Sequence, residues 1–92
     1  GENMKNIKAC DLKKEYNIID LRTKGEYMKG HIYNAKNIDM NNLTDMPHMY
    51  LDKNETYYIY CTEGFKSKRC CKFLEVMGYN VVNVIDGYEG FI

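Results

Sequence analysis

One cysteine, Cys61, has neighbours that could turn its thiol into a nucleophile. It ends an aromatic, β-branched run and precedes a short glycine-containing loop that leads into a segment of helical periodicity. The free N–H groups and partial positive charge at a helix start lower the pKa of a thiol, and Lys66 should add to this effect. We therefore predict that Cys61 is a catalytic thiolate. Its expected anion-binding loop consists of Thr62, Glu63, Gly64, Phe65, Lys66 and Ser67.

Positive charge gathers around this cysteine. Residues 61–72 hold four basic side chains and one acidic one, a surplus of three (four minus one). The basic residues are Lys66, Lys68, Arg69 and Lys72, and the acidic residue is Glu63. A positive rim beside a nucleophile suits an anionic substrate or an acidic partner surface. A lysine-rich helix face that only contacts water is the alternative explanation of the same pattern.

The other three cysteines, Cys10, Cys70 and Cys71, are expected to be reduced. An even number of cysteines allows disulfides, but adjacent cysteines rarely form structural bridges, and the chain shows no secretory leader. No Cys-x-x-Cys pair is present and the two histidines form no paired motif, so we expect no metal site and no cofactor. Cys70 falls on an apolar stripe and is expected in the core, whereas Cys71 is expected to be more exposed. The spacing also disfavours a disulfide of either with Cys61.

Short strands alternate with helical segments along the chain, which predicts an α/β fold with a mostly parallel sheet and helices on both faces. Thr23 has the position of a helix N-cap, Glu26 that of its capping-box partner, and Gly30 that of a helix stop. A further helix is predicted from apolar residues at helical spacing, which are Cys70, Phe73, Leu74 and Met77. The expected strands are 6–9, 17–21, 35–39, 56–61 and 80–85. Besides the helix after Thr23, the expected helical segments are 11–16, 41–46, 67–77 and 87–91.

Length, composition and charge limit the class of protein. The 92 residues fit one domain, which we place at residues 4–92, and residues 1–3 are interpreted as a cloning remnant. Thirteen basic and thirteen acidic side chains cancel, which argues against a dedicated nucleic-acid binder. No apolar run approaches the roughly 20 residues of a membrane helix. We therefore expect a cytoplasmic protein without nucleic-acid or membrane partners.

Four segments, in this order and spacing, resemble the rhodanese family of sulfurtransferases. The first two are Asp20-Leu21-Arg22 with Glu26-Tyr27, and Gly30-His31-Ile32 with Asn34-Ala35. The third, Cys61 to Ser67, is similar to the family's loop Cys-x-x-Gly-x-Arg-Ser. The fourth comprises Gly78-Tyr79, Val82, Val84 and Asp86-Gly87 to Phe91. The resemblance implies a single rhodanese-like domain with a five-stranded, mostly parallel sheet and helices on both faces.

The resemblance also implies a sulfurtransferase in which Cys61 carries a persulfide between two half-reactions. The thiolate would take a sulfane sulfur from a small anionic donor such as thiosulfate, and a thiol, cyanide or an acceptor protein would remove it. Lys66, Lys68 and Arg69 are expected to steer the donor or partner. Lys66 replaces the family's usual arginine, which keeps the charge but loses bidentate recognition of an oxyanion.

Four residues of the resembling segments are expected to be structural. Asp20 and Arg22 flank the end of a buried strand, and we expect them to form a cluster of charges and hydrogen bonds with Glu26. His31 is expected to fix a turn. Departures from the family pattern are Asn34 and Asp86, where glycine is common, and Phe91, where tryptophan is common.

Two other functions remain open. A non-enzymatic module that relays sulfur, binds partners or senses redox state could use the same loop, and a solvent-open Cys61 would favour protein partners over thiosulfate. A cysteine phosphatase or arsenate reductase needs the spacing Cys-x5-Arg, so that one arginine clamps the oxyanion. Ser67 occupies that position and Arg69 lies too far along the helix, so this second alternative is disfavoured.

Overall fold

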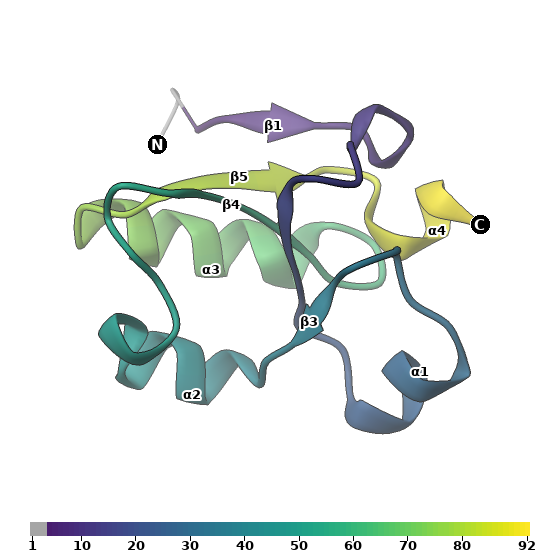
Figure 1. Cartoon of the computed structure of the whole chain (residues 1–92), viewed down its shortest axis with the longest axis horizontal. Helices are drawn as coiled ribbons and strands as arrows, with labels where there is room; N and C mark the ends of the chain where they lie inside the picture. Colours follow the sequence, from purple (N-terminus) through teal and green to yellow (C-terminus); the bar gives the residue numbers. More distant parts are fainter. Residues whose placement is uncertain (1–3) are drawn as a thin grey trace.

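The computed structural model describes residues 4–92, so the interpretation of residues 1–3 lies outside the described residues. Five strands form one sheet in the spatial order β1-β5-β4-β2-β3, and every neighbouring pair is parallel (Figure 1). The strands are β1 (Asn6–Ile7), β2 (Asn17–Asp20), β3 (Lys36–Asn37), β4 (Thr56–Tyr60) and β5 (Asn80–Val84). The helices are α1 (Lys24–Lys29), α2 (Met40–Asp45), α3 (Phe65–Val76) and α4 (Gly87–Phe91), with 3₁₀ turns at Ala9–Asp11 and Pro47–Met49. The predicted α/β class and five-stranded parallel sheet are confirmed.

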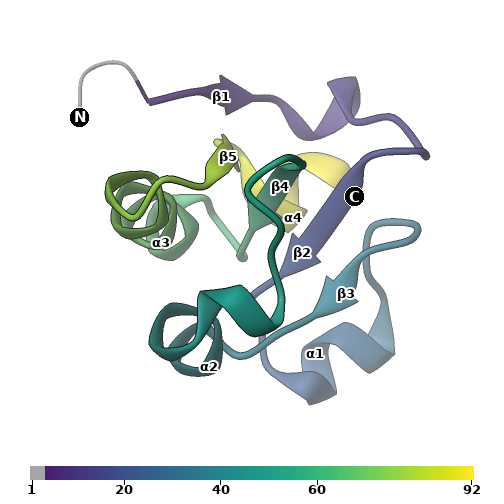
Figure 2. The same ribbon diagram turned by 60° about the vertical axis from the view of Figure 1, so that its left-hand side comes forward.

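Helices cover both faces of this sheet (Figure 2). Successive strand residues point to opposite faces, and the central strands are apolar on both. One core lies under α2 and α3 and includes Ile19, Ile59, Val81, Leu43 and Leu74. The other lies toward α1 and α4 and includes Ile18, Tyr60, Val84, Tyr27, Tyr88 and Phe91. Burial on both faces accounts for the continuous apolar runs of the central strands.

The predicted boundaries of α1 are confirmed. The hydroxyl of Thr23 accepts the N–H of Glu26 at 3.2 Å, and the carboxylate of Glu26 accepts the N–H of Thr23 at 3.1 Å. This reciprocal pair satisfies N–H groups that a helix start leaves free. Gly30 ends the helix. The short loop between β2 and α1 is therefore held in place at its last residue, Thr23.

Other sequence-based boundaries are wrong, and packing explains them. Segment 11–16 forms no α-helix, and only its first residue, Asp11, belongs to a helical turn, the 3₁₀ turn Ala9–Asp11. The outermost strands, β1 and β3, have two residues each, because each pairs on one side only. Helix α3 begins at Phe65, two residues before the predicted start, because Gly64 takes the N-cap position with a left-handed φ of +94°.

The buried face of α3 also differs from the predicted apolar stripe. Cys71, expected to be more exposed, is fully buried, whereas Phe73 is 47% and Met77 is 42% exposed. The helix lies on β4 and β5 and also beside α2, so its buried side is set by both neighbours. The residues that it buries are Ser67, Cys70, Cys71 and Leu74, again at helical spacing.

Candidate active site

Cys61 directly follows β4, at the edge of the sheet where the carboxyl ends of the strands meet. In open parallel sheets this edge is where ligands bind. The carbonyl of Cys61 accepts the N–H of Tyr88 at 2.9 Å, which ties the end of β4 to α4. Gly87 makes this contact possible, because its φ is +60° and a Cβ there would press on the carbonyls of Cys61 and Thr62.

The sulfur of Cys61 lies inside the first turn of α3. Its Sγ accepts the N–H of Gly64 at 3.2 Å and the N–H of Ser67 at 3.3 Å. The hydroxyl oxygen of Ser67 is 3.4 Å from the same sulfur. Free N–H groups and the partial positive charge at the N-terminus of a helix suit an anion. The loop can therefore hold a negative charge on this sulfur.

Gly64 is required for this geometry. Its backbone φ of +94° is one that residues with a side chain rarely adopt, and a Cβ there would collide with the carbonyl of Ile85. The loop thus passes directly over the end of β5. That close approach turns the N–H of Gly64 toward the sulfur.

The pKa of Cys61 is lowered from its ordinary value. Burial acts to raise this pKa, and the contact of the sulfur with the Ser67 side chain, together with hydrogen bonds from the N–H groups of Ser67, Gly64 and Glu63, outweighs it. The charge of Lys66, which was also expected to contribute, is not among the largest causes of the shift. Local hydrogen bonds therefore favour the thiolate.

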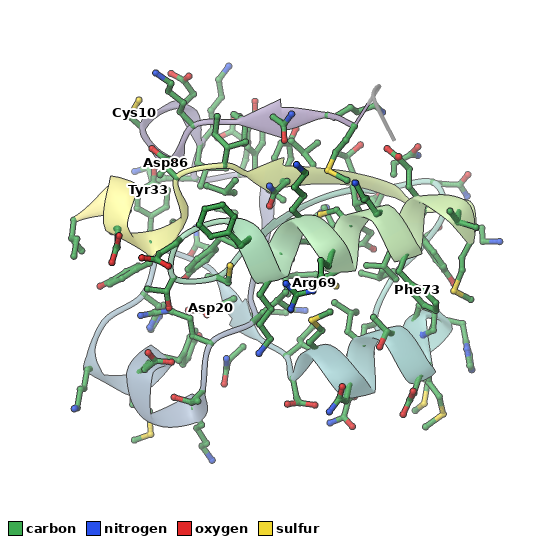
Figure 3. All side chains as sticks on the ribbon, turned by 180° about the vertical axis from the view of Figure 1, so that it is seen from behind. Cys10, Asp20, Tyr33, Arg69, Phe73 and Asp86 are labelled. Atoms are coloured by element: carbon green, nitrogen blue, oxygen red, sulfur yellow. The ribbon has the colours of Figure 1, made fainter. Side chains whose placement is uncertain are left out.

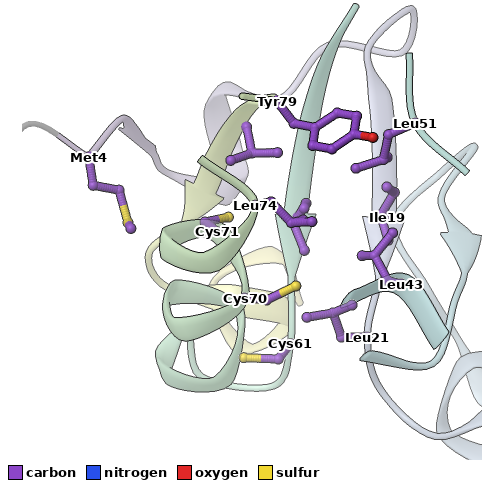
Figure 4. Close-up of a cluster of buried hydrophobic side chains, with 12 residues drawn as sticks. Met4, Ile19, Leu21, Leu43, Leu51, Cys61, Cys70, Cys71, Leu74 and Tyr79 are labelled. Carbon is purple, nitrogen blue, oxygen red and sulfur yellow. The ribbon is translucent and has the colours of Figure 1, made fainter. Parts of the chain in front are cut away.

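The other buried cysteines have the opposite character. Burial raises the pKa of Cys70 to about 12 and also raises that of Cys71. The sulfur atoms of Cys61 and Cys70 point in opposite directions in the view of Figure 4. All four cysteines are free, and Cys10 is exposed. Cys61 alone combines burial with a pKa shift toward the thiolate.

A second layer of polar contacts lies beneath the loop. Asn83 of β5 is 2% exposed, and its Oδ1 accepts the Ser67 hydroxyl at 2.6 Å. Its Nδ2 donates to the carbonyl of Gly64 at 3.2 Å. Sequence reasoning missed Asn83, although one polar residue within Val81-Val82-Asn83-Val84 is the kind of signal that could have revealed it.

An open pocket of about 270 Å³ surrounds Cys61. It is lined by Cys61, Thr62, Glu63, Phe65, Lys66 and Arg69. Two of the three predicted steering residues, Lys66 and Arg69, are therefore brought to the cysteine (Arg69 is labelled in Figure 3). Lys68 is not, because it lines a separate cavity of about 390 Å³ beside β1. Cys61 itself is 6% exposed, at the base of this pocket.

A buried ion pair supports the strand ends beside the site. The Arg22 guanidinium donates to the Asp20 carboxylate at 2.8 Å, and the Tyr60 hydroxyl donates to the same carboxylate at 2.6 Å. The guanidinium also lies 3.9 Å from the centre of the Tyr88 ring. Glu26 was expected in this cluster, but its carboxylate is taken by the Thr23 cap instead. The ion pair thereby links β2, β4 and α4.

The remaining predicted residues lie in turns. The Nδ1 of His31 is 2.8 Å from the Tyr27 carbonyl and its ring stacks on the Tyr27 ring, just after α1. Asn34 has a backbone φ of +63°, which lies in the left-handed region that favours glycine. Asp86 accepts the N–H of Ala9 at 2.8 Å. Within residues 4–92, no three His, Cys, Asp or Glu side chains gather as metal ligands, and no helix is long and apolar enough to span a membrane.

Comparisons with known proteins agree with this arrangement. The family model described as "Rhodanese-like domain" matches residues 2–92. "Putative sulfurtransferase YtwF" of Bacillus subtilis is 34% identical over 73 residues, covering 79% of this chain and 70% of that protein. "Thiosulfate sulfurtransferase PspE" of Escherichia coli is 31% identical over 72 residues, covering 77% and 69%. The crystal structure of SSP1007 from Staphylococcus saprophyticus superposes with a TM-score of 0.88 at 38% identity, covering 97% of this chain and 94% of that one.

Proposed function

Because the chain belongs to the rhodanese-like domain family and is similar to proteins named sulfurtransferases, we propose that it transfers a sulfane sulfur through a persulfide on Cys61. The observation that carries this proposal is the sulfur of Cys61 held by the N–H groups of Gly64 and Ser67. These contacts lower the pKa of the thiol, so a nucleophile is available without a separate general base.

The first half-reaction loads the cysteine. The Cys61 thiolate attacks the outer sulfur of thiosulfate and a new S–S bond forms at Sγ. The S–S bond of the donor breaks, and sulfite leaves with the electron pair. The terminal sulfur of the persulfide carries the negative charge, and the N–H groups of the loop stabilise it as an oxyanion hole stabilises an oxyanion.

The second half-reaction returns the enzyme to its starting state. A thiolate, cyanide or an acceptor protein attacks the terminal sulfur and forms a bond to it. The S–S bond to Sγ breaks and the Cys61 thiolate is regenerated. Donor and acceptor thus react in turn with one sulfur atom, which predicts ping-pong kinetics. Over the two half-reactions together the protein neither gains nor loses electrons, and neither step as written uses a metal.

The charge and shape of the pocket favour an anionic donor and leave room for a protein acceptor. Lys66 and Arg69 line it together with Cys61, and positive charge there attracts thiosulfate. Phe65, 69% exposed at the same rim, offers an apolar contact to an acceptor protein. A reducing compartment such as the cytoplasm suits free thiols.

Thiocyanate formation from thiosulfate and cyanide tests the proposal. The Cys61→Ser variant is expected to form none, while the matched variant Cys10→Ser keeps the wild-type rate, because Cys10 is exposed and lies away from the pocket. Double-reciprocal plots at several cyanide concentrations are expected to be parallel. Intersecting lines would contradict the persulfide intermediate, and equal rates for both variants would contradict the role of Cys61.

A paired substitution tests the steering charge. Lys66→Met is expected to raise the KM for thiosulfate, because it removes a charge that lines the pocket. Lys13→Met removes the same charge from an exposed position before β2 that does not line the pocket, and it serves as the control. An equal effect of the two substitutions would show that overall charge, and not this pocket, attracts the donor.

A sulfur relay between proteins is the second candidate, favoured by the openness of the pocket and the exposed Phe65. In that case Cys61 accepts sulfur, but small acceptors remove it slowly. Loading that is fast and followed by slow thiocyanate release would favour the relay. Fast turnover with cyanide would favour the enzyme acting on small molecules.

A further inference from the structure

The hydroxyl of Ser67 lies between two groups that can both accept its single proton. On one side, Oδ1 of Asn83 is 2.6 Å from Oγ. On the other side, Sγ of Cys61 is 3.4 Å from Oγ. A hydroxyl donates one hydrogen bond and accepts others. Its orientation therefore decides whether it stabilises the thiol or the thiolate.

The Gly64 carbonyl fixes the orientation of the Asn83 amide. A carbonyl can only accept, and it lies 3.2 Å from Nδ2 of Asn83. Turning the amide over would place two acceptors, Oδ1 and the Gly64 carbonyl, face to face in a buried site. Oδ1 of Asn83 must therefore point at Ser67 and accept the hydrogen bond that the Ser67 hydroxyl donates. The backbone of the anion-binding loop and the Ser67 hydroxyl are thus both set by one side chain of β5.

The consequence differs between the two ionisation states of Cys61. When the thiol is protonated, its S–H donates to Oγ of Ser67 and the hydroxyl donates to Asn83, so every group has a partner. When the thiol ionises, the hydroxyl can stabilise the sulfur only by turning away from Asn83. Oδ1 then remains buried without a donor, which carries a free-energy cost.

We propose that Asn83 is a positioning residue that competes with Cys61 for the proton of Ser67 and thereby restrains formation of the thiolate. On ionisation the thiol proton passes to water and the Ser67 hydroxyl rotates, with no change of oxidation state. The inference rests on the proposed function only for the meaning of the thiolate, because the ionisation itself can be measured without sulfur transfer.

Other titratable groups face Cys61 and do not depend on Asn83. The loop and α3 contribute Glu63, Lys66 and Arg69 around the pocket, and α3 contributes Cys70 and Cys71 beneath it. Each of these groups is unchanged by a substitution at Asn83. Their contributions to the ionisation of Cys61 therefore cancel when variants at Asn83 are compared.

A double-mutant cycle isolates the competition. Asn83→Leu keeps the approximate shape of the side chain but removes both hydrogen bonds, and Ser67→Ala removes the hydroxyl. Loss of the donor to Gly64 affects Cys61 in both backgrounds, whereas release of the proton can act only when Ser67 is present. All variants carry Cys10→Ser, so that Cys61 is the accessible thiol.

The readout is the Cys61 ionisation constant, from the pH dependence of alkylation by iodoacetamide. Asn83→Leu is expected to increase the ionisation constant of Cys61 more in the protein that has Ser67 than in the Ser67→Ala variant. The coupling expected for a hydrogen bond gained by a charged group is about ten- to a hundredfold in this constant. Thermal unfolding verifies that each variant is folded, and Asn83→Val replaces Asn83→Leu if the latter is not.

Equal shifts in the two backgrounds, or a coupling of opposite sign, would overturn the proposal. A purely structural Asn83 would lower the melting temperature without any such coupling. If the coupling appears but no donor loads sulfur onto Cys61, the proposed function fails and the role of Asn83 stands. If sulfur is loaded onto Cys61 but the coupling is absent, the proposed function stands and the role of Asn83 fails.

Discussion

Replacing Gly64 with alanine tests whether the backbone of the loop holds the Cys61 thiolate. Gly64 has a φ of +94°, and an added Cβ would collide with the carbonyl of Ile85 at the end of β5. A left-handed conformation costs an ordinary residue about 1–2 kcal/mol, before the collision is counted. The variant can relieve both the backbone strain and the collision only by moving the loop away from β5.

That movement has a calculable effect on Cys61. The N–H of Gly64 is 3.2 Å from Sγ, and a shift of the loop breaks this hydrogen bond. A hydrogen bond to a charged group contributes about 1.5–3 kcal/mol, and one pKa unit corresponds to about 1.4 kcal/mol. Losing it should therefore raise the pKa of Cys61 by about one to two units, while the free energy of unfolding falls by at least about 1 kcal/mol.

The assay combines iodoacetamide alkylation of Cys61 across a pH series with urea denaturation. Gly25→Ala is the matched control, because Gly25 lies in α1 with no atom within 4 Å of its Cβ position. This control should leave the Cys61 pKa unchanged and stabilise the fold by about 0.5–1 kcal/mol, since alanine favours a helix. An unchanged pKa in folded Gly64→Ala protein would refute the argument that this N–H stabilises the thiolate.

Three further predictions address the core and the titration of the thiols. Arg22→Met leaves the Asp20 carboxylate buried without its partner and should lower the free energy of unfolding by about 3–5 kcal/mol in urea denaturation. The pKa of Cys61 is lower in the folded than in the unfolded state, so its contribution to stability is complete above the unfolded pKa. That contribution is lost as the pH falls through the folded value, and the difference in urea stability between wild type and Cys61→Ser should follow this course. Cys70, with a pKa raised to about 12, should resist alkylation near neutral pH until the protein is denatured, whereas exposed Cys10 reacts; peptide mass spectrometry distinguishes the two.

Much of the fold follows from local sequence signals that point the same way. The β-branched and aromatic runs that became β2, β4 and β5 are recognisable because a parallel sheet buries both faces. Thr23 and Glu26 indicate the start of α1 through hydrogen bonds between neighbours in sequence. The buried face of α3 was harder to predict. Cys71 is buried and Phe73 is exposed because α2 and the sheet together determine that face, and no local spacing encodes their positions.

The candidate site likewise contains some contacts that the sequence indicates and others that only the folded chain creates. Cys61, Gly64 and Ser67 were identifiable because a strand, a glycine loop and a helix start follow one another in sequence. Asn83 was not, since it reaches the loop from β5, which is brought beside β4 only by folding. Lys68 was expected at the pocket from its sequence position, but the helical turn directs it to a different cavity. Contacts within the loop were therefore predictable, and contacts between elements were not.

Intact-mass spectrometry after incubation with thiosulfate shows whether Cys61 carries a sulfane sulfur. The wild-type protein should gain the mass of one sulfur atom, and cyanide should remove it. The Cys61→Ser variant should gain none, and the Cys10→Ser variant should gain as much as the wild type. A wild-type protein that gains no sulfur from thiosulfate or any other sulfane donor would contradict the proposal that Cys61 carries this sulfur, as would an equal gain by the Cys61→Ser variant.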